Sequence, residues 1–243
     1  MSANSPLRIR LGSANAYLVP ARTGYVLIDT GDPGLTFLLF RALKRHQISP
    51  HQIRLIILTH IHYDHIGGLW AVQAQSGAPV MVHEAEAADL AAGRVVIPAG
   101  TYPVSKLLAA LGQRASRFFR FPGYRAETIV TGEEQSLHEF GLDGCILHTP
   151  GHSPGSTTIL LDNGDAFVGD LCPNTWYNRW LLHSHFPPYA DDVAAVYRSW
   201  ARLLSTPTQT LYPGHGAPHP MEELRWDRVM RGRMGNSKYK SPT

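Results

Sequence analysis

The stretch Leu58–Leu69, "LTHIHYDHIGGL", has three histidines and an aspartate within six consecutive residues. The run that leads into it, "IRLIILT" (Ile53–Thr59), is mostly aliphatic and is predicted to be a buried strand. Side chains two apart on a strand point the same way, so His60 and His62 can bind one metal ion from the same side. The pattern predicts a metal site at the end of a central strand.

The second half of the stretch follows the end of that strand. Asp64 and His65 come where the chain can direct them toward a second ion. Gly67 and Gly68 then allow a tight turn into the next helix. A polar loop with incidental histidines is the alternative, but the joint spacing H-x-H-x-D-H after an aliphatic strand disfavours it.

Three more candidate ligands lie far along the chain, each at the end of a strand-like run. His152 stands in "CILHTPGHSPGS", Asp170 in "AFVGDL" and His215 in "TLYPGHG". Each follows a glycine, as expected where the backbone must bend to bring a side chain into a crowded site. One such turn means little, but several together with the histidine stretch favour a shared site.

Composition limits the classes of protein to consider. A chain of 243 residues with 44% hydrophobic content can bury a sizeable core, and we expect a single domain over 1–243. The net charge of +3 has its surplus in Arg114–Arg125 and after Arg225, without a polybasic run, so no nucleic-acid partner is expected. Cys145 and Cys172 form no CxxC pattern, which suits a reducing compartment. Without a signal-peptide pattern or about 18 consecutive apolar residues, the sequence predicts a soluble cytoplasmic protein without a membrane partner.

Strand-like runs alternate with helical patterns along the chain. The predicted strands are "LRIRL", "AYLVP", "YVLID", "IRLIILT", "PVMVH", "CILHT", "TTILLD", "AFVGD" and "TLYPG". The predicted helices cover residues 34–46, 67–77, 85–93 and 191–205. Sheets packed together with helices outside fit this order better than a plain βαβ repeat. Two stretches, at about 94–125 and 171–189, fit neither pattern and are predicted to be insertions on the rim of a site.

The combined motifs resemble the metallo-β-lactamase superfamily, and "LIDTG" around Asp29 matches that family's first motif. The similarity runs from about residue 15 to 217. It implies an α/β fold, an αββα sandwich of two mixed sheets flanked by helices, with two metal ions at the edge where the sheets meet. The implied ligands are His60, His62 and His152 for one ion, Asp64, His65 and His215 for the other, and Asp170 as the bridge. Asp29 is expected outside the ligand set, orienting a ligand or the turn.

The donor set also limits the metal and the chemistry. Five imidazoles and two carboxylates without a thiolate suit zinc, while manganese and iron stay open as alternatives. Two ions sharing one water would make hydroxide available near neutral pH, to attack a carbonyl carbon or a phosphorus. Asp64 is the expected proton shuttle to the leaving group. We therefore predict a dinuclear hydrolase that acts on a small molecule, with a homodimer left open as its assembly.

The sequence limits the identity of the substrate less than it limits the type of reaction. The β-lactamases with a similar "TPGHSPGSTT" stretch lack a bridging aspartate, whereas lactonases with all seven ligands have a tyrosine where Pro173 stands here. Glyoxalase II usually has a histidine in place of Ser156, and the RNA-cleaving branch has a large insertion that is missing here. We predict a carboxylic ester, lactone or related acyl substrate. The alternatives are a phosphodiesterase, a β-lactam hydrolase and a mononuclear iron oxygenase resembling persulfide dioxygenases.

The two predicted rim insertions are rich in aromatic residues. We expect them to fold over the site and form an apolar pocket, the alternative being that they pack on one another as a small satellite core. The predicted pocket residues are Phe119, Tyr124, Trp176, Tyr177 and Trp180.

The remaining candidates are interpreted as structural. His83 is expected to cap the helix that follows it, and His148 to pack beneath the site. His183 and His185 repeat the H-x-H spacing but are predicted to be surface or pocket-rim residues. Cys172 is predicted to be a buried thiol.

Overall fold

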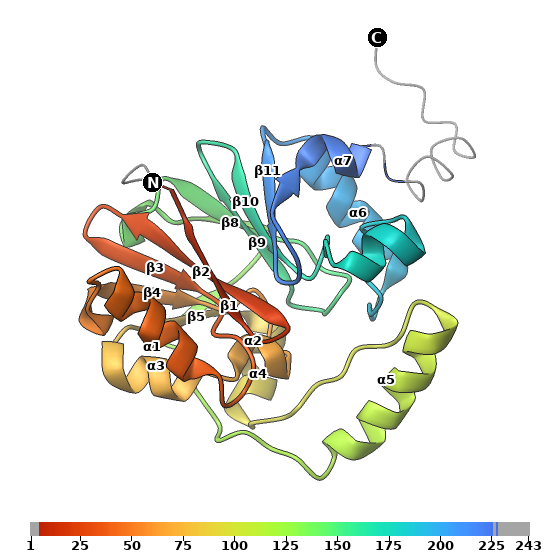
Figure 1. The fold of residues 1–243 in the computed structure, drawn as a ribbon, viewed down its shortest axis with the longest axis horizontal. Coiled ribbons are helices and arrows are strands. Elements are labelled where there is room, and N and C mark those ends of the chain that lie inside the picture. The colour runs from red at the N-terminus through yellow and green to blue at the C-terminus, as the bar shows by residue number, and fades with distance from the viewer. Residues whose placement is uncertain (1–4, 226, 228–243) are drawn as a thin grey trace.

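Two six-stranded mixed sheets form the centre of the computed structural model, which describes residues 5–225 and 227 (Figure 1). The first sheet has the order β1 (Leu7–Leu11), β2 (Ala14–Ala21), β3 (Gly24–Ile28), β4 (Ile53–Ile57), β5 (Val80–His83) and β6 (Thr128–Val130). Its first three strands are antiparallel, and β3 to β6 run parallel.

The second sheet has the order β12 (His219–Pro220), β11 (Thr210–Pro213), β10 (Asp165–Gly169), β9 (Thr157–Leu161), β8 (Gly144–His148) and β7 (Glu134–Ser136). Its pairs are antiparallel except for β10 with β11. The nine predicted strands are all present, and the short strands β6, β7 and β12 extend the sheets beyond the prediction.

Helices cover the outer faces of both sheets (Figure 1). On the first sheet lie α1 (Thr36–Arg45), α3 (Leu69–Ser76) and α4 (Glu84–Ala91), with the 3₁₀ turn η1 (Pro50–Gln52) before β4. On the second lie α6 (Val193–Leu204) and α7 (Met221–Arg225), and the 3₁₀ turn η2 (His138–Phe140) precedes β8. None of the helices within residues 5–225 is long and apolar enough to cross a bilayer.

Three apolar layers hold the sandwich together. One lies between the first sheet and its helices, a second between the two sheets, and a third between the second sheet and α6. Strand β4 belongs to two of them, since Ile56 faces the helices and Ile57 faces the second sheet. This double burial explains why its last three residues, Leu55–Ile57, are all aliphatic rather than alternating with polar residues. The predicted αββα sandwich is confirmed.

The segment 94–125 is predicted to fit neither helix nor strand, but this is wrong, because it contains the helix α5 (Pro103–Ser116). The sequence carries the signal for it, because apolar residues follow Pro103 at helical spacing: Val104, Leu107, Leu108 and Leu111. The side that α5 buries contains the small residues Ser105 and Ala109, whereas these four larger side chains are 52–71% exposed. Helix α5 extends away from the sandwich (Figure 1).

The segment 171–189 contains one helical turn, the π-helical η3 (Asn178–Leu182). Asn178 is buried, and its side-chain amide donates to the carbonyl oxygens of Ser184 and Phe186. These bonds fold the segment back on itself next to the second sheet.

Candidate metal centre

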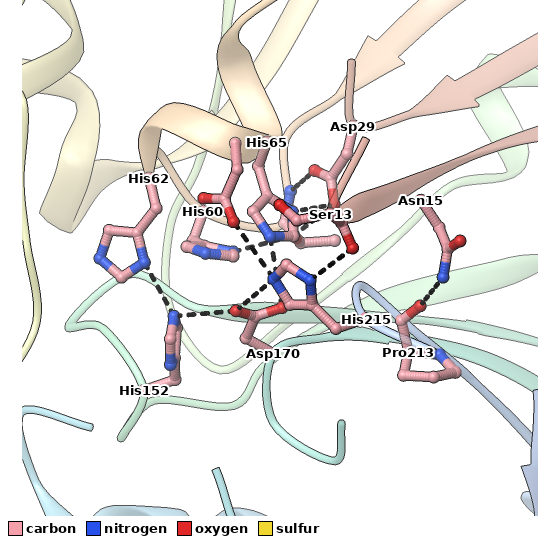
Figure 2. A network of polar contacts seen from close by, with 12 residues as sticks. Ser13, Asn15, Asp29, His60, His62, His65, His152, Asp170, Pro213 and His215 are labelled. Carbon is pink, nitrogen blue, oxygen red and sulfur yellow. Dashed lines mark hydrogen bonds and ion pairs between the residues drawn. The ribbon is translucent and has the colours of Figure 1, made fainter. Parts of the chain in front are cut away.

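The candidate ligands converge at one edge of the sandwich (Figure 2). His60 and His62 follow β4, and His62 is the residue before the short helix α2 (Tyr63–Ile66), which carries Asp64 and His65. The other three come from the second sheet, where His152 follows β8, Asp170 follows β10 and His215 follows β11. The edge thus joins residues that are up to 155 positions apart in the sequence, from His60 to His215.

The ligand atoms form three overlapping groups, each with all its atoms within 4.8 Å of one another. The groups are His60, His62 and His152; His60, His65 and Asp170; and Asp64, His65 and His215.

Asp170 lies between the histidines of both ends of this cluster. Its Oδ1 is 3.2 Å from His65 Nε2, and its Oδ2 is 3.5 Å from His152 Nε2 and 3.2 Å from His215 Nε2. The glycine before it makes this position accessible, because Gly169 has φ +50 and a Cβ there would approach Thr59 Oγ1 to 2.8 Å. The carboxylate is therefore placed to contact two groups of imidazoles at once.

Several buried atoms of this cluster lack a hydrogen bond within the part of the chain that the structure describes. They are His60 Nε2, His62 Nε2, His65 Nε2 and Asp170 Oδ1. An unpaired buried polar atom costs about 1–3 kcal/mol, so four in one place call for a ligand. Nitrogen and carboxylate lone pairs converging at this distance fit divalent cations.

The outer nitrogens of four of the five imidazoles are fixed by hydrogen bonds, whereas His62 turns its Nδ1 inward, to 2.8 Å from His152 Nε2 (Figure 2). His65 Nδ1 is 2.8 Å from Asp29 Oδ2, and His60 Nδ1 is 3.0 Å from Thr59 Oγ1. His152 Nδ1 is 2.8 Å from the carbonyl oxygen of Tyr189, and His215 Nδ1 is 2.8 Å from that of Ser13. An N–H donated outward leaves the Nε2 lone pair directed inward, as metal ligands require.

Asp29 therefore contacts a candidate ligand rather than the cluster's centre. Its carboxylate accepts from Thr59 N and Thr59 Oγ1, both at 2.8 Å, as well as from His65. Its backbone has φ +58, a left-handed conformation that is uncommon for a residue other than glycine. The structure holds this strain where the carboxylate orients His65.

Burial favours the neutral ligand form of three of the histidines. Burial lowers the pKa of His60, His62 and His152, which keeps their imidazoles neutral at neutral pH. Burial alone would lower the pKa of His65 and His215 too, but the charge of Asp170 raises both, to about 10 for His215, so these two rings must lose a proton when a metal binds. Burial alone would raise the pKa of Asp64, but the hydrogen bond from His215 and the charges of His65 and His215 bring that pKa to about 2. Asp64 is thus ionised at neutral pH.

Glu86, on α4, connects the two ligand loops and is not among the residues predicted from the sequence. Its Oε2 accepts from Ile61 N, between His60 and His62, at 2.7 Å. Its Oε1 accepts from Ser153 Oγ, next to His152, and from Gly155 N at 3.2 Å. The side chain is only 4% exposed, and nothing in "HEAEA" distinguishes it from a surface helix residue.

Replacing Glu86 by glutamine should weaken both the fold and the metal centre. An amide NH₂ would face a backbone or hydroxyl donor, at a cost of about 1–3 kcal/mol in unfolding free energy. Because both ligand loops lose their common anchor, metal affinity should fall by about 10- to 100-fold. Denaturant unfolding of the metal-free protein and a chelator competition would measure the two effects. The control is Glu84→Gln, an exposed change on the same helix, and equal behaviour of the two variants would contradict the anchoring role.

A cavity of about 810 Å³ opens from the cluster. One end is lined by five of the candidate ligands, and the rest is lined mainly by apolar residues of 96–112 and 173–189. Both predicted rim segments thus contribute to one cavity beside the candidate ligands.

The predicted pocket residues are mostly elsewhere. Tyr177 lines the cavity, but Phe119, Tyr124, Trp176 and Trp180 are not among its lining residues, which corrects the prediction. Trp176 and Trp180 are 77% and 79% exposed, and the residues of η3 that line the cavity are Asn178, Leu181 and Leu182. They do not form a buried satellite core either.

The two residues of the first rim segment differ from each other. Phe119 is 65% exposed beyond the end of α5, where the chain returns to the sandwich. Tyr124 packs against the core beneath the first sheet's helices, and its hydroxyl donates to Glu127 at 2.8 Å. Residue type predicted an apolar segment but could not predict which side chains face the cavity.

The other histidines lie outside the cluster. His83 caps α4 by accepting from Ala85 N at 3.2 Å, and its ring stacks on His148 at 4.0 Å. His185 stacks on His219 at 4.2 Å, and His183 is exposed. The last of these predicted residues, Cys172, is fully buried in the layer beneath α6.

Comparison with known proteins agrees with this geometry. A family model described as the metallo-beta-lactamase superfamily matches residues 9–215. The probable metallo-hydrolase YflN of Bacillus subtilis is 28% identical over 88% of this chain and 84% of its own length. The probable metallo-hydrolase MJ0888 of Methanocaldococcus jannaschii is 30% identical over 84% of this chain and 88% of its own length.

Solved structures show the same fold. The protein TTHA1623, in a di-iron-bound form, is 28% identical with a TM-score of 0.65, over 92% of this chain and 99% of its own. The B3 metallo-beta-lactamase BLEG-1 is 23% identical with a TM-score of 0.63, over 90% of this chain and 95% of its own.

Proposed function

Since the chain belongs to the metallo-beta-lactamase superfamily, we propose that it is a dinuclear metal-dependent hydrolase of a carboxylic ester, lactone or related acyl compound. The observation that carries the proposal is Asp170, whose carboxylate lies 3.2–3.5 Å from imidazoles at both ends of the cluster. Its substrate is a small molecule, and its location is the cytoplasm, where the free Cys145 and Cys172 stay reduced.

The residues divide into two ligand sets that share one carboxylate. His60, His62 and His152 would hold one ion, Asp64, His65 and His215 the other, and Asp170 would contact both. Zinc suits this nitrogen and oxygen set best, with manganese and iron as the alternatives. When bound, two such ions supply hydroxide at neutral pH and polarise the carbonyl under attack.

The chain's own residues orient the substrate and move a proton. Asp64 is ionised at neutral pH, with a pKa of about 2, and lies on the cavity wall. It can accept the proton of the attacking hydroxide for an instant and, being a strong acid once protonated, pass it to the departing alkoxide. The apolar walls of the cavity keep water from the acyl group on its other sides.

The cavity's lining predicts the substrate's shape. Beyond the candidate ligands it is walled by Ile97, Val104 and Leu108 on one side and by Leu181 on the other. An acyl chain buried there would contribute about 0.8 kcal/mol per methylene, or about fourfold in kcat/KM. We therefore propose an acyl substrate with an apolar chain of several carbons.

A series of esters or lactones of increasing chain length tests the pocket. kcat/KM should climb over several carbons, and Leu108→Ala should flatten the climb while metal content is unchanged. Leu107→Ala is the matched control, since Leu107 is the neighbouring residue on α5, is similarly exposed and does not line the cavity. No dependence on chain length, or the same flattening by both variants, would contradict the apolar subsite.

A substrate panel tests the reaction class separately from chain length. It should contain p-nitrophenyl esters, lactones, a chromogenic β-lactam and bis-p-nitrophenyl phosphate, with metal quantified and oxygen consumption followed. We expect turnover of esters or lactones by protein with two ions per centre. Fastest turnover of the phosphodiester or the β-lactam, or one iron with oxygen consumption, would replace the proposal by the corresponding alternative.

A further inference from the structure

A second group of metal-binding side chains lies outside the candidate metal centre and shares no residue with it. It contains His185 of the segment 171–189, His219 of β12 and Glu223 of α7. One ligand atom from each lies within 4.8 Å of the others. Glu223 Oε2 is 3.4 Å from His185 Nε2 and 3.7 Å from His219 Nδ1. Both histidines are buried, at 9% and 3% exposure.

Each neutral imidazole has only one N–H to donate, and this limit indicates that a cation binds here. His185 Nδ1 is 3.3 Å from the carbonyl oxygen of Pro173, and His219 Nε2 is 3.4 Å from that of Cys172. Carbonyl oxygens only accept, so the single N–H of each neutral imidazole is donated there. The lone pairs of His185 Nε2 and His219 Nδ1 then face a carboxylate oxygen, which has only lone pairs to offer. Three lone pairs that converge repel one another unless a positive charge lies between them.

A proton on each ring is a poor source of that charge. His219 is 3% exposed, so an imidazolium charge there would lose most of its hydration. The rings stack with their centroids 4.2 Å apart, so two imidazolium ions would repel each other at close range. His219 Nδ1 is also buried without a hydrogen bond to any of the residues that the structure describes. The nitrogen thus faces Glu223 without a hydrogen bond, while Arg179 borders the depression beside it.

We propose that His185 Nε2, His219 Nδ1 and Glu223 Oε2 bind a divalent transition-metal ion, zinc in the first place. Two imidazoles and one carboxylate are a familiar zinc donor set, and the carbonyl bonds to the outer nitrogens are the support that such ligands usually have. Glu223 is 41% exposed at its side chain, and the group borders an open depression, so water can complete the coordination.

The imidazole rings of His185 and His219 must rotate out of their parallel stack for the ion to bind. They are now within 11° of parallel, whereas the rings of His60, His62 and His152 meet at 73–87°. Asp227 holds the backbone of His185 through a 2.6 Å bond to its N–H, so ring rotation rather than loop movement is the cheaper change. The bound ion would tie β12 and α7 to the segment that leaves Asp170, and its role would be structural.

Metal counting on the full chain tests the site. Wild type, His219→Ala and Glu223→Gln would be equilibrated with zinc, passed through a desalting column and measured by mass spectrometry. The wild-type count should exceed that of His219→Ala by one ion per chain, and Glu223→Gln should bind that ion at least about tenfold more weakly. Glu222→Gln is the control, because it makes the same change one residue earlier and its carboxylate pairs with Arg225 at 3.6 Å. Equal zinc in wild type and in folded His219→Ala would overturn the proposal.

The same experiment separates this site from the candidate metal centre. Asp170→Ala should lower the metal count while it keeps the ion that His219→Ala loses, and ester hydrolysis should persist in Glu223→Gln. If circular dichroism shows that His219→Ala is unfolded, the zinc affinity of Glu223→Gln against Glu222→Gln decides the question. Identical affinities of those two variants would reject the site, whatever the reaction at the other centre.

Discussion

Asp170→Ala is expected to lower kcat/KM by at least about 10²-fold and to leave fewer bound metal ions than in the wild type. The variant removes the carboxylate that contacts His65, His152 and His215 together. Two divalent ions held by largely neutral imidazoles would then repel each other without a shared anion between them. Metal analysis and initial rates on the same preparation measure both effects.

The matched control for this variant lies at the start of the strand that leads to Asp170. Asp165→Asn changes a carboxylate at the opposite end of β10, where it is paired with Asn163 near the surface. It should keep wild-type metal and activity. Asp170→Ala with a full complement of ions would show that the carboxylate does not bridge, even if the rate had fallen.

The sandwich was predictable because its strands have strong local patterns. Runs such as "IRLIILT" are aliphatic and short, and a strand buried on both faces needs that composition. The short strands β6, β7 and β12 have two or three residues each and no such pattern. They pair because neighbouring strands have free edges. Those edges form only when the sheet folds, so the local sequence cannot show them.

Helix α5 shows a different limit. Its apolar residues recur at helical spacing, but the positions that it buries are Ser105 and Ala109. A helix whose larger side chains face a cavity or solvent contradicts the usual assumption that an apolar stripe faces the core. Trp176 and Trp180 likewise face solvent, although apolar side chains are expected to face inward, and they lie outside the cavity.

The candidate ligands could be selected from sequence because their residue types and spacing are unusual, whereas their supports could not. Glu86 contacts two backbone N–H groups and a hydroxyl, and each of these contacts depends on how distant loops fold together. The cluster of His185, His219 and Glu223 joins positions that only the pairing of β11 with β12 and the start of α7 bring together.

Asp64→Asn is expected to slow the hydrolysis of alkyl esters by about 10²- to 10⁴-fold, the range that general acid–base groups contribute. Asp64 Oδ2 is 3.2 Å from His215 Nε2 and borders the cavity, so it lies near both the candidate ligands and a bound acyl group. Asparagine keeps the shape and one carbonyl oxygen but cannot carry a proton. The alkoxide of an alkyl ester leaves poorly without one, so this substrate should show the full loss.

The leaving group distinguishes proton transfer from metal binding in this variant. A p-nitrophenolate departs without being protonated, so Asp64→Asn should lose much less activity on p-nitrophenyl esters than on alkyl esters of the same acyl chain. The dependence of log kcat on leaving-group pKa should therefore become steeper than in the wild type, when both proteins are assayed at measured and equal metal content. A loss of the same size on every leaving group, accompanied by lost metal, would mean that Asp64 acts as a ligand and that the proton moves by another route.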